Sequence, residues 1–117
     1  MSRPSPGPLN AFCVDTEEWF HVCAVDTPYM DPSTWDAAPA RVERDVDVLL
    51  ALLDETGAKG TFPTLGWIAR KYPAMVRRIA DQLHEVGCHG YYHRLVYEQT
   101  PADFRTEIDT ARKLLQD

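Results

Sequence analysis

The stretch Val86-Gly87-Cys88-His89-Gly90-Tyr91-Tyr92-His93 places a short apolar run directly before a turn that carries two histidines. The run over 86–88 predicts a tight strand that delivers His89 to the end of a sheet. His89 and His93 are four residues apart, a spacing that is familiar from zinc sites. The pair could equally be one core histidine and one surface histidine, so the rest of the sequence has to be weighed with it.

A second cluster of ionisable residues follows another apolar run, Leu9 to Val14, which we expect to form a buried strand. The cluster begins with Asp15 and continues with Glu17 and Glu18. Alternate residues of an extended segment point the same way, so Asp15 and Glu17 can face one site. One carboxylate would bind a cation there, and the other would act as a general base. The alternative is a solvated acidic turn.

Imidazole and carboxylate groups together are what a zinc-like ion requires, and three such ligands leave a coordination position open for water. Water on such an ion becomes a usable nucleophile near neutral pH. The two clusters therefore predict metal-assisted hydrolysis.

The predicted elements alternate between strands and helices along the chain. They are a strand over 9–14, a long loop over 19–39, a helix over 41–56, a strand over 59–65, a helix over 73–83, the strand over 86–88 and a helix that begins at Thr100–Pro101. Gly57 predicts the C-cap of the first helix, and Pro63 predicts that regular strand pairing ends near it. This order predicts an α/β fold with a parallel sheet and crossover helices. Both ionisable clusters follow the C-terminal ends of strands, where such folds place their chemistry.

The helices are expected to bury one apolar face each. These faces comprise Val42, Val46, Leu49, Leu50 and Leu53 in the first helix, Val76, Ile79, Ala80 and Leu83 in the second, and Phe104, Ile108, Ala111 and Leu115 in the third.

Composition excludes several classes of function. The chain has 117 residues and a net charge of −6, which fits one small domain and argues against a nucleic-acid or anionic-membrane role. It has no apolar run near the roughly 20 residues that cross a bilayer, and the Pro-rich residues 1–8 read as a flexible leader without a secretory signal. Its three cysteines show no disulfide spacing, so we expect a cytoplasmic location, with Cys88 as a small buried thiol.

Two further groups of residues have open interpretations. Trp19, Phe20, Tyr29 and Trp35 in the long loop could stack on a sugar ring or could simply pack the loop onto the domain. His21 and His84 are interpreted as packing or surface residues.

Several motifs of the sequence resemble those of a known protein family. Phe12 to Phe20, Gly60 to Phe62, Leu65 to Trp67 and His84 to Arg94 are similar to the polysaccharide deacetylases, also called the NodB homology domain or carbohydrate esterase family 4. The continuation to Pro101 resembles the subgroup found with bacterial exopolysaccharide and exosortase systems. The resemblance extends over residues 9–117.

This resemblance implies a (β/α) barrel of the NodB type, present here as a partial barrel truncated after about three βα units. It implies a hydrolase of carbon–nitrogen, non-peptide bonds that removes N-acetyl groups from the amino sugars of a polysaccharide or oligosaccharide, with a divalent metal, usually Zn²⁺. The motifs assign Asp15 as general base and Glu17, His89 and His93 as metal ligands, with Glu18 competing for the place of Glu17. The residues assigned to substrate binding are Trp19, Tyr92 and Arg94. The alternative is a non-catalytic fragment or pseudoenzyme that binds metal or glycan without turnover.

The sequence also departs from the family pattern. The family's later Arg-Pro, Asp-Trp and Leu-x-His motifs, the last of which supplies the general acid, are not found after His93, so residues 9–117 are interpreted as the N-terminal part of a deacetylase domain. Cys88 replaces a usual serine or threonine, and Pro63 replaces an apolar strand residue. A partial barrel leaves sheet edges uncovered, so we expect the isolated chain to aggregate.

Overall fold

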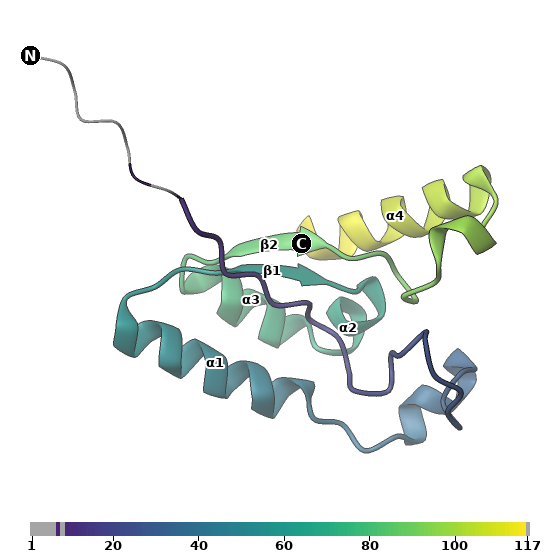
Figure 1. The fold of residues 1–117 in the computed structure, drawn as a ribbon, viewed down its shortest axis with the longest axis horizontal. Coiled ribbons are helices and arrows are strands. Elements are labelled where there is room, and N and C mark those ends of the chain that lie inside the picture. Colours follow the sequence, from purple (N-terminus) through teal and green to yellow (C-terminus); the bar gives the residue numbers. More distant parts are fainter. Residues whose placement is uncertain (1–6, 8, 117) are drawn as a thin grey trace, which may run out of the picture.

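The computed structural model describes residue 7 and residues 9–116. The leader expected over residues 1–8 lies outside the described residues except for Gly7. The elements follow in the order η1 (Pro32–Ala37), α1 (Val42–Thr56), β1 (Thr61–Thr64), α2 (Gly66–Lys71), α3 (Pro73–Asp81), β2 (Glu85–Cys88), η2 (Val96–Glu98) and α4 (Pro101–Gln116). Figure 1 shows β1 and β2 side by side, with α1 along one side of them and α4 along the other. The expected α/β architecture with parallel strands is therefore confirmed.

The strands pair in parallel, from Thr61 opposite Glu85 to Thr64 opposite Cys88. The N-terminal segment runs along the other edge of β1 and forms isolated parallel bridges from Cys13 to Thr61 and from Thr16 to Thr64. The expectation of a buried strand over 9–14 was wrong, because Leu9 is 94% exposed and Phe12 about half exposed. In the described part of the chain, β1 is the one strand that this segment pairs with, so its outer side stays open to solvent.

Pro63 lies inside β1, and the regular pairing of β1 with β2 ends at Thr64, one residue beyond it, which agrees with the expectation from sequence. The Pro63 carbonyl accepts the Thr16 N–H at 2.7 Å, and Leu65 N–H donates to the Thr16 carbonyl at 3.3 Å. Proline lacks the N–H that would face Val14 in this register. The Thr16 hydroxyl donates to the Val14 carbonyl at 3.1 Å instead, so the lost ladder bond leaves no unsatisfied carbonyl there.

The helices mostly follow their predicted faces. Val42, Val46, Leu50 and Leu53 of α1 are buried, and Gly57 ends the helix with a left-handed φ of 71°. They pack in one core with residues of β1, α2 and α3, namely Phe62, Leu65, Ile68, Met75 and Ile79. At the start of α4 the Thr100 hydroxyl accepts the Asp103 N–H at 3.1 Å, as predicted for an N-cap.

The second helix differs from its prediction. The helix expected over 73–83 ends at Asp81, and the short helix α2 precedes it. Leu83 was expected in the core but has a φ of 65° and is largely exposed, because the chain turns there toward β2. Cys88, expected to be buried, is exposed at the end of β2. Among the described residues, no helix is both long and apolar enough to cross a membrane.

Candidate metal centre

Strand pairing brings the two predicted clusters to the same edge of the sheet. Thr16 is bridged to Thr64 from one side of β1, and His89 N–H donates to the Thr64 carbonyl at 3.0 Å from the other side. Glu17 therefore follows the last paired residue of its segment, while His89 directly follows β2. The two side chains meet over the C-terminal end of β1 because both neighbouring segments end their pairing at the same residue.

Three donor groups converge at this edge. Ligand atoms of Glu17, His89 and His93 all lie within 4.8 Å of one another. His93 Nε2 is 3.3 Å from Glu17 Oε2, and His89 Nε2 is 3.7 Å from Glu17 Oε1. Asp15 lies at the rim, with Oδ2 3.8 Å from His89 Nε2 and with 57% of its side chain exposed.

The donor atoms fit a cation. Glu17 Oε2 and His89 Nε2 are both buried, and neither has a hydrogen-bond partner within the described residues. Buried polar atoms without partners are rare, and each one calls for an explanation such as an ion. One carboxylate and two imidazoles, aimed at a shared space, are a donor set that suits zinc or a similar divalent ion.

Glu18 has a different environment from Glu17. It is 2% exposed, and its Oε1 accepts the backbone N–H groups of Arg41 and Val42 at 3.0 Å each, while Oε2 accepts the Arg41 N–H at 3.1 Å. These N–H groups lie at the N-terminus of α1, where a helix leaves its first donors unsatisfied and favours negative charge. Glu18 thus caps α1, and Glu17 is the carboxylate that faces the histidines.

Burial and nearby charges shift the pKa values of several groups around the cluster. Interaction with the Glu17 carboxylate raises the pKa of His89, and Asp15 adds to this while burial opposes it. Burial, followed by repulsion from His93, lowers the pKa of His21 to about 3. Burial, followed by Glu17 and Glu98, raises the pKa of Cys23. At neutral pH, His21 is therefore neutral and Cys23 is a thiol.

The structure also reveals two residues that the sequence analysis did not assign to the site. His21 is buried, and its Nδ1 accepts the Glu18 N–H at 2.9 Å, which holds the turn after Glu17. Cys23 places its sulfur 3.3 Å from His93 Nδ1. Cys23 and His93 are 70 residues apart, so no local pattern in the sequence could have paired them.

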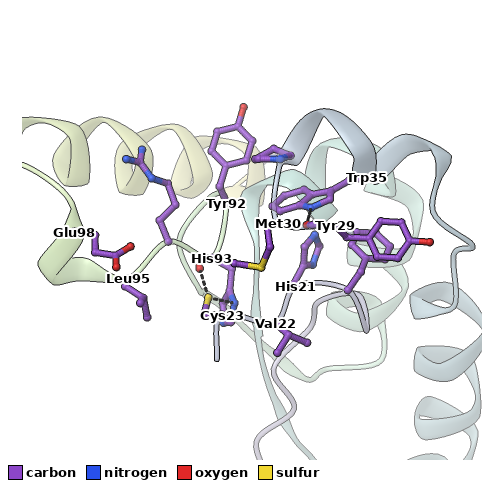
Figure 2. A pocket seen from close by; sticks show the side chains of 13 residues that line it. His21, Val22, Cys23, Tyr29, Met30, Trp35, Tyr92, His93, Leu95 and Glu98 are labelled. Carbon is purple, nitrogen blue, oxygen red and sulfur yellow. Dashed lines mark hydrogen bonds between the residues drawn. The ribbon is translucent and has the colours of Figure 1, made fainter. Parts of the chain in front are cut away.

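The three residues predicted to bind substrate do not all line the same cavity. Tyr92 and Arg94 line a cavity of about 480 Å³ beside His93, together with aromatic side chains of the 20–35 loop. Figure 2 shows Tyr92 and Trp35 on one wall of this cavity and Cys23 with His93 on another. Trp19 instead lines an adjoining open hollow together with Glu17, and its indole N–H donates to the Pro39 carbonyl at 2.8 Å.

The aromatic residues of the long loop mainly hold the loop in place. Phe20, Trp35 and Ala38 form a small second core, with Tyr29, Trp67 and Tyr92 packed against it. The ring centroids of Trp35 and Trp67 are 5.3 Å apart in an edge-to-face arrangement, which is the geometry that aromatic pairs favour. Of the two sequence interpretations, packing accounts for Phe20, Tyr29 and Trp35, whereas Trp19 borders the hollow that Glu17 also lines.

Comparison with known proteins bears directly on this site. The sequence pattern of the family described as polysaccharide deacetylase matches residues 32–117, a range that includes His89 and His93 and begins after Glu17. The peptidoglycan-N-acetylglucosamine deacetylase of Bacillus cereus is 33% identical over 67 residues, which cover 57% of this chain and 24% of that protein.

Solved structures agree with the match. A crystal structure of a peptidoglycan N-acetylglucosamine deacetylase is 31% identical, with a TM-score of 0.60 over 61% of this chain and 33% of that one. A structure from Mycobacterium smegmatis, assigned to the polysaccharide deacetylases, is 26% identical, with a TM-score of 0.72 over 91% of this chain and 37% of that one. The chain thus spans 24% to 37% of the length of these relatives. Since the family pattern covers most of its residues, this chain belongs to the polysaccharide deacetylase family.

Proposed function

We propose that this chain supplies the metal-binding part of an enzyme that removes N-acetyl groups from amino sugars of a polysaccharide. The supporting observation is the convergence of Glu17, His89 and His93, whose ligand atoms lie within 4.8 Å of one another. In this proposal these three residues bind a divalent cation, with zinc favoured by the two imidazoles. Membership of the deacetylase family supports the reaction class.

A cation held by these residues would supply Lewis acidity, which polarises the acetamide carbonyl and activates water. Glu17 provides the negative charge of the ligand set, and the two histidines bind as neutral imidazoles. In this proposal the Asp15 carboxylate, at the solvent-facing rim, accepts the proton of the attacking water. Water adds to the acetyl carbon, the C–N bond breaks, and acetate and a free amine form. We expect the group that protonates the leaving nitrogen in the part of the relatives' length that this chain does not span.

The substrate residues are part of the same proposal. Tyr92 and Arg94 border the cavity next to His93, and Trp19 borders the hollow next to Glu17, so a glycan could contact both sides of the metal centre. A polymer of N-acetylated hexosamine, such as an exopolysaccharide, is the substrate class that we propose. The cytoplasmic location expected from the sequence stays a prediction.

Zinc binding tests the ligand set. The purified chain is stripped with chelator, reloaded and assayed for metal content as wild type and as Glu17→Gln, His89→Ala and His93→Ala. Glu55→Gln, an exposed substitution of the same kind on α1, is the matched control. We expect stoichiometric zinc in the wild type and the control, and its loss in the three ligand variants. Unchanged zinc content in any of the three would overturn the set.

Acetate release tests the reaction. The assay uses oligomers of N-acetylglucosamine and the same zinc-loaded samples. Because the general acid is expected outside this chain, we expect only slow zinc-dependent release of acetate, which Asp15→Asn abolishes while its zinc content is retained. Zinc binding without acetate release from the wild-type chain would favour a second candidate, a metal- or glycan-binding chain without turnover.

A further inference from the structure

Cys23 contacts His93 through both the ring and the backbone. Its sulfur lies 3.3 Å from His93 Nδ1, and its thiol donates to the His93 carbonyl oxygen at 2.9 Å. Figure 2 shows both contacts as dashed lines from the same sulfur atom. They join the loop that follows Glu17 to the turn that carries His93.

The two contacts allow an arrangement of protons that suits metal binding. A neutral imidazole carries one N–H, and a metal ligand must keep the other nitrogen free. His93 Nε2 faces Glu17 Oε2 at 3.3 Å, so Nε2 is the atom turned toward the candidate metal centre. A ring that binds a cation through Nε2 must carry its proton on Nδ1, where the Cys23 sulfur can accept it at 3.3 Å. The thiol hydrogen is directed to the His93 carbonyl, so each group of the pair has one partner.

The backbone conformation of His93 is a second, independent indication that neighbouring residues hold His93 in place. Its φ is 57°, in the left-handed region that residues other than glycine rarely adopt. A backbone in this conformation persists only when its surroundings hold it there. The thiol bond to the His93 carbonyl is one such constraint, and it fixes the same peptide from which the ring projects.

We propose that Cys23 is a positioning residue that holds His93 in the Nδ1–H tautomer and aims its Nε2 at the metal centre. The proposal rests on the proposed function for the role of the metal, although the tautomer itself can be observed without metal. Metal-binding histidines generally donate their second ring N–H to a carboxylate, a carbonyl or a water, and loss of that partner typically weakens metal binding. Here a thiol occupies the partner's place. The competing explanation is that Cys23 only fills space in the loop.

Substitutions at Cys23 separate these explanations. Serine keeps a hydroxyl that can accept from Nδ1 and donate to the carbonyl, whereas alanine removes both contacts. Cys13→Ala is the matched control, since Cys13 is an exposed thiol with no part in the site. We expect Cys23→Ala to weaken zinc binding about 10- to 100-fold, measured by competition with a chelator. Cys23→Ser should stay within about threefold of the wild type, and the control should be unchanged.

The second measurement reports the tautomer directly. In the zinc-free protein, ¹⁵N chemical shifts of the His93 ring should show the proton on Nδ1 in the wild type and in Cys23→Ser, and a mixture of tautomers in Cys23→Ala. A wild-type ring protonated on Nε2 would overturn the proposal without any variant. So would a folded Cys23→Ala that binds zinc as tightly as the wild type. If the wild type binds no zinc but shows the Nδ1–H tautomer, the proposed function fails while the positioning contact stands.

Discussion

Replacing Glu18 with glutamine keeps the size of the side chain and removes the charge that faces the N-terminus of α1. The carboxylate accepts three contacts from two backbone N–H groups, those of Arg41 and Val42. A glutamine offers one carbonyl oxygen, and its amide NH₂ would then point at a backbone donor. Because Glu18 is 2% exposed, water cannot replace the lost acceptor.

The expected loss follows from these contacts. A hydrogen bond to a charged group contributes about 1.5 to 3 kcal/mol, and a carboxylate at a helix N-terminus adds about 0.3 to 1 kcal/mol. Glutamine retains part of the first contribution and loses the second, and it also avoids burying a charge. We therefore expect Glu18→Gln to lower the free energy of unfolding by about 2 kcal/mol.

Urea unfolding of the zinc-free protein, followed by tryptophan fluorescence, measures this change, and zinc content is measured on separately reloaded samples. Glu18→Gln should lose stability and keep its zinc. The neighbouring Glu17→Gln should lose zinc and keep its free energy of unfolding within about 0.5 kcal/mol, because Glu17 Oε2 has no hydrogen-bond partner in the described chain. If Glu18→Gln instead lost zinc at unchanged stability, the separation of roles between the two carboxylates would be refuted.

Three further outcomes are expected. Gly66→Ala should lower the free energy of unfolding by about 2 to 3 kcal/mol in the same urea assay. The reason is that the added Cβ would lie 2.5 Å from the Tyr91 ring and 2.8 Å from Ala111 Cβ. An unchanged free energy of unfolding would show that α2 can move away from Tyr91 and α4 without cost. In the folded state burial lowers the pKa of His21 to about 3, against the ordinary value of 6.5 in the unfolded chain. The neutral ring therefore contributes fully to the free energy of unfolding above pH 6.5. This free energy falls by about 1.4 kcal/mol per pH unit as the pH is lowered from 6.5 toward 3. His21→Asn, which keeps an acceptor for Glu18 N–H, should show a weaker loss of stability on acidification; parallel pH profiles would contradict this. The isolated chain should self-associate in sedimentation experiments, since large apolar side chains are exposed along it, and a monodisperse monomer with cooperative unfolding would be the contrary result.

Short-range patterns predicted most of the elements correctly. The face of α1 and its C-cap at Gly57 follow from a helical period and one residue with access to positive φ, both of which depend only on neighbouring residues. The N-cap at Thr100 is equally local. The meeting of Glu17 with His89 was predictable in outline, because parallel strands place their C-terminal ends at one edge.

Other features depend on contacts between distant segments. Glu17 and Glu18 are identical in type and adjacent in sequence, and their roles separate because the N-terminus of α1 docks against one of them. Pro63 remains paired because the Thr16 hydroxyl satisfies the Val14 carbonyl. Leu83 leaves the core because α3 ends two residues before it.

The residue types and their spacing in the sequence therefore identify the ends of the strands and the side chains that are suited to bind a metal. Which carboxylate faces the histidines, and which thiol orients His93, follows from the packing of segments that are 23 or more residues apart. Helical periodicity and capping depend on residues that are close in the sequence. Contacts between side chains that are far apart in the sequence form only when the chain folds.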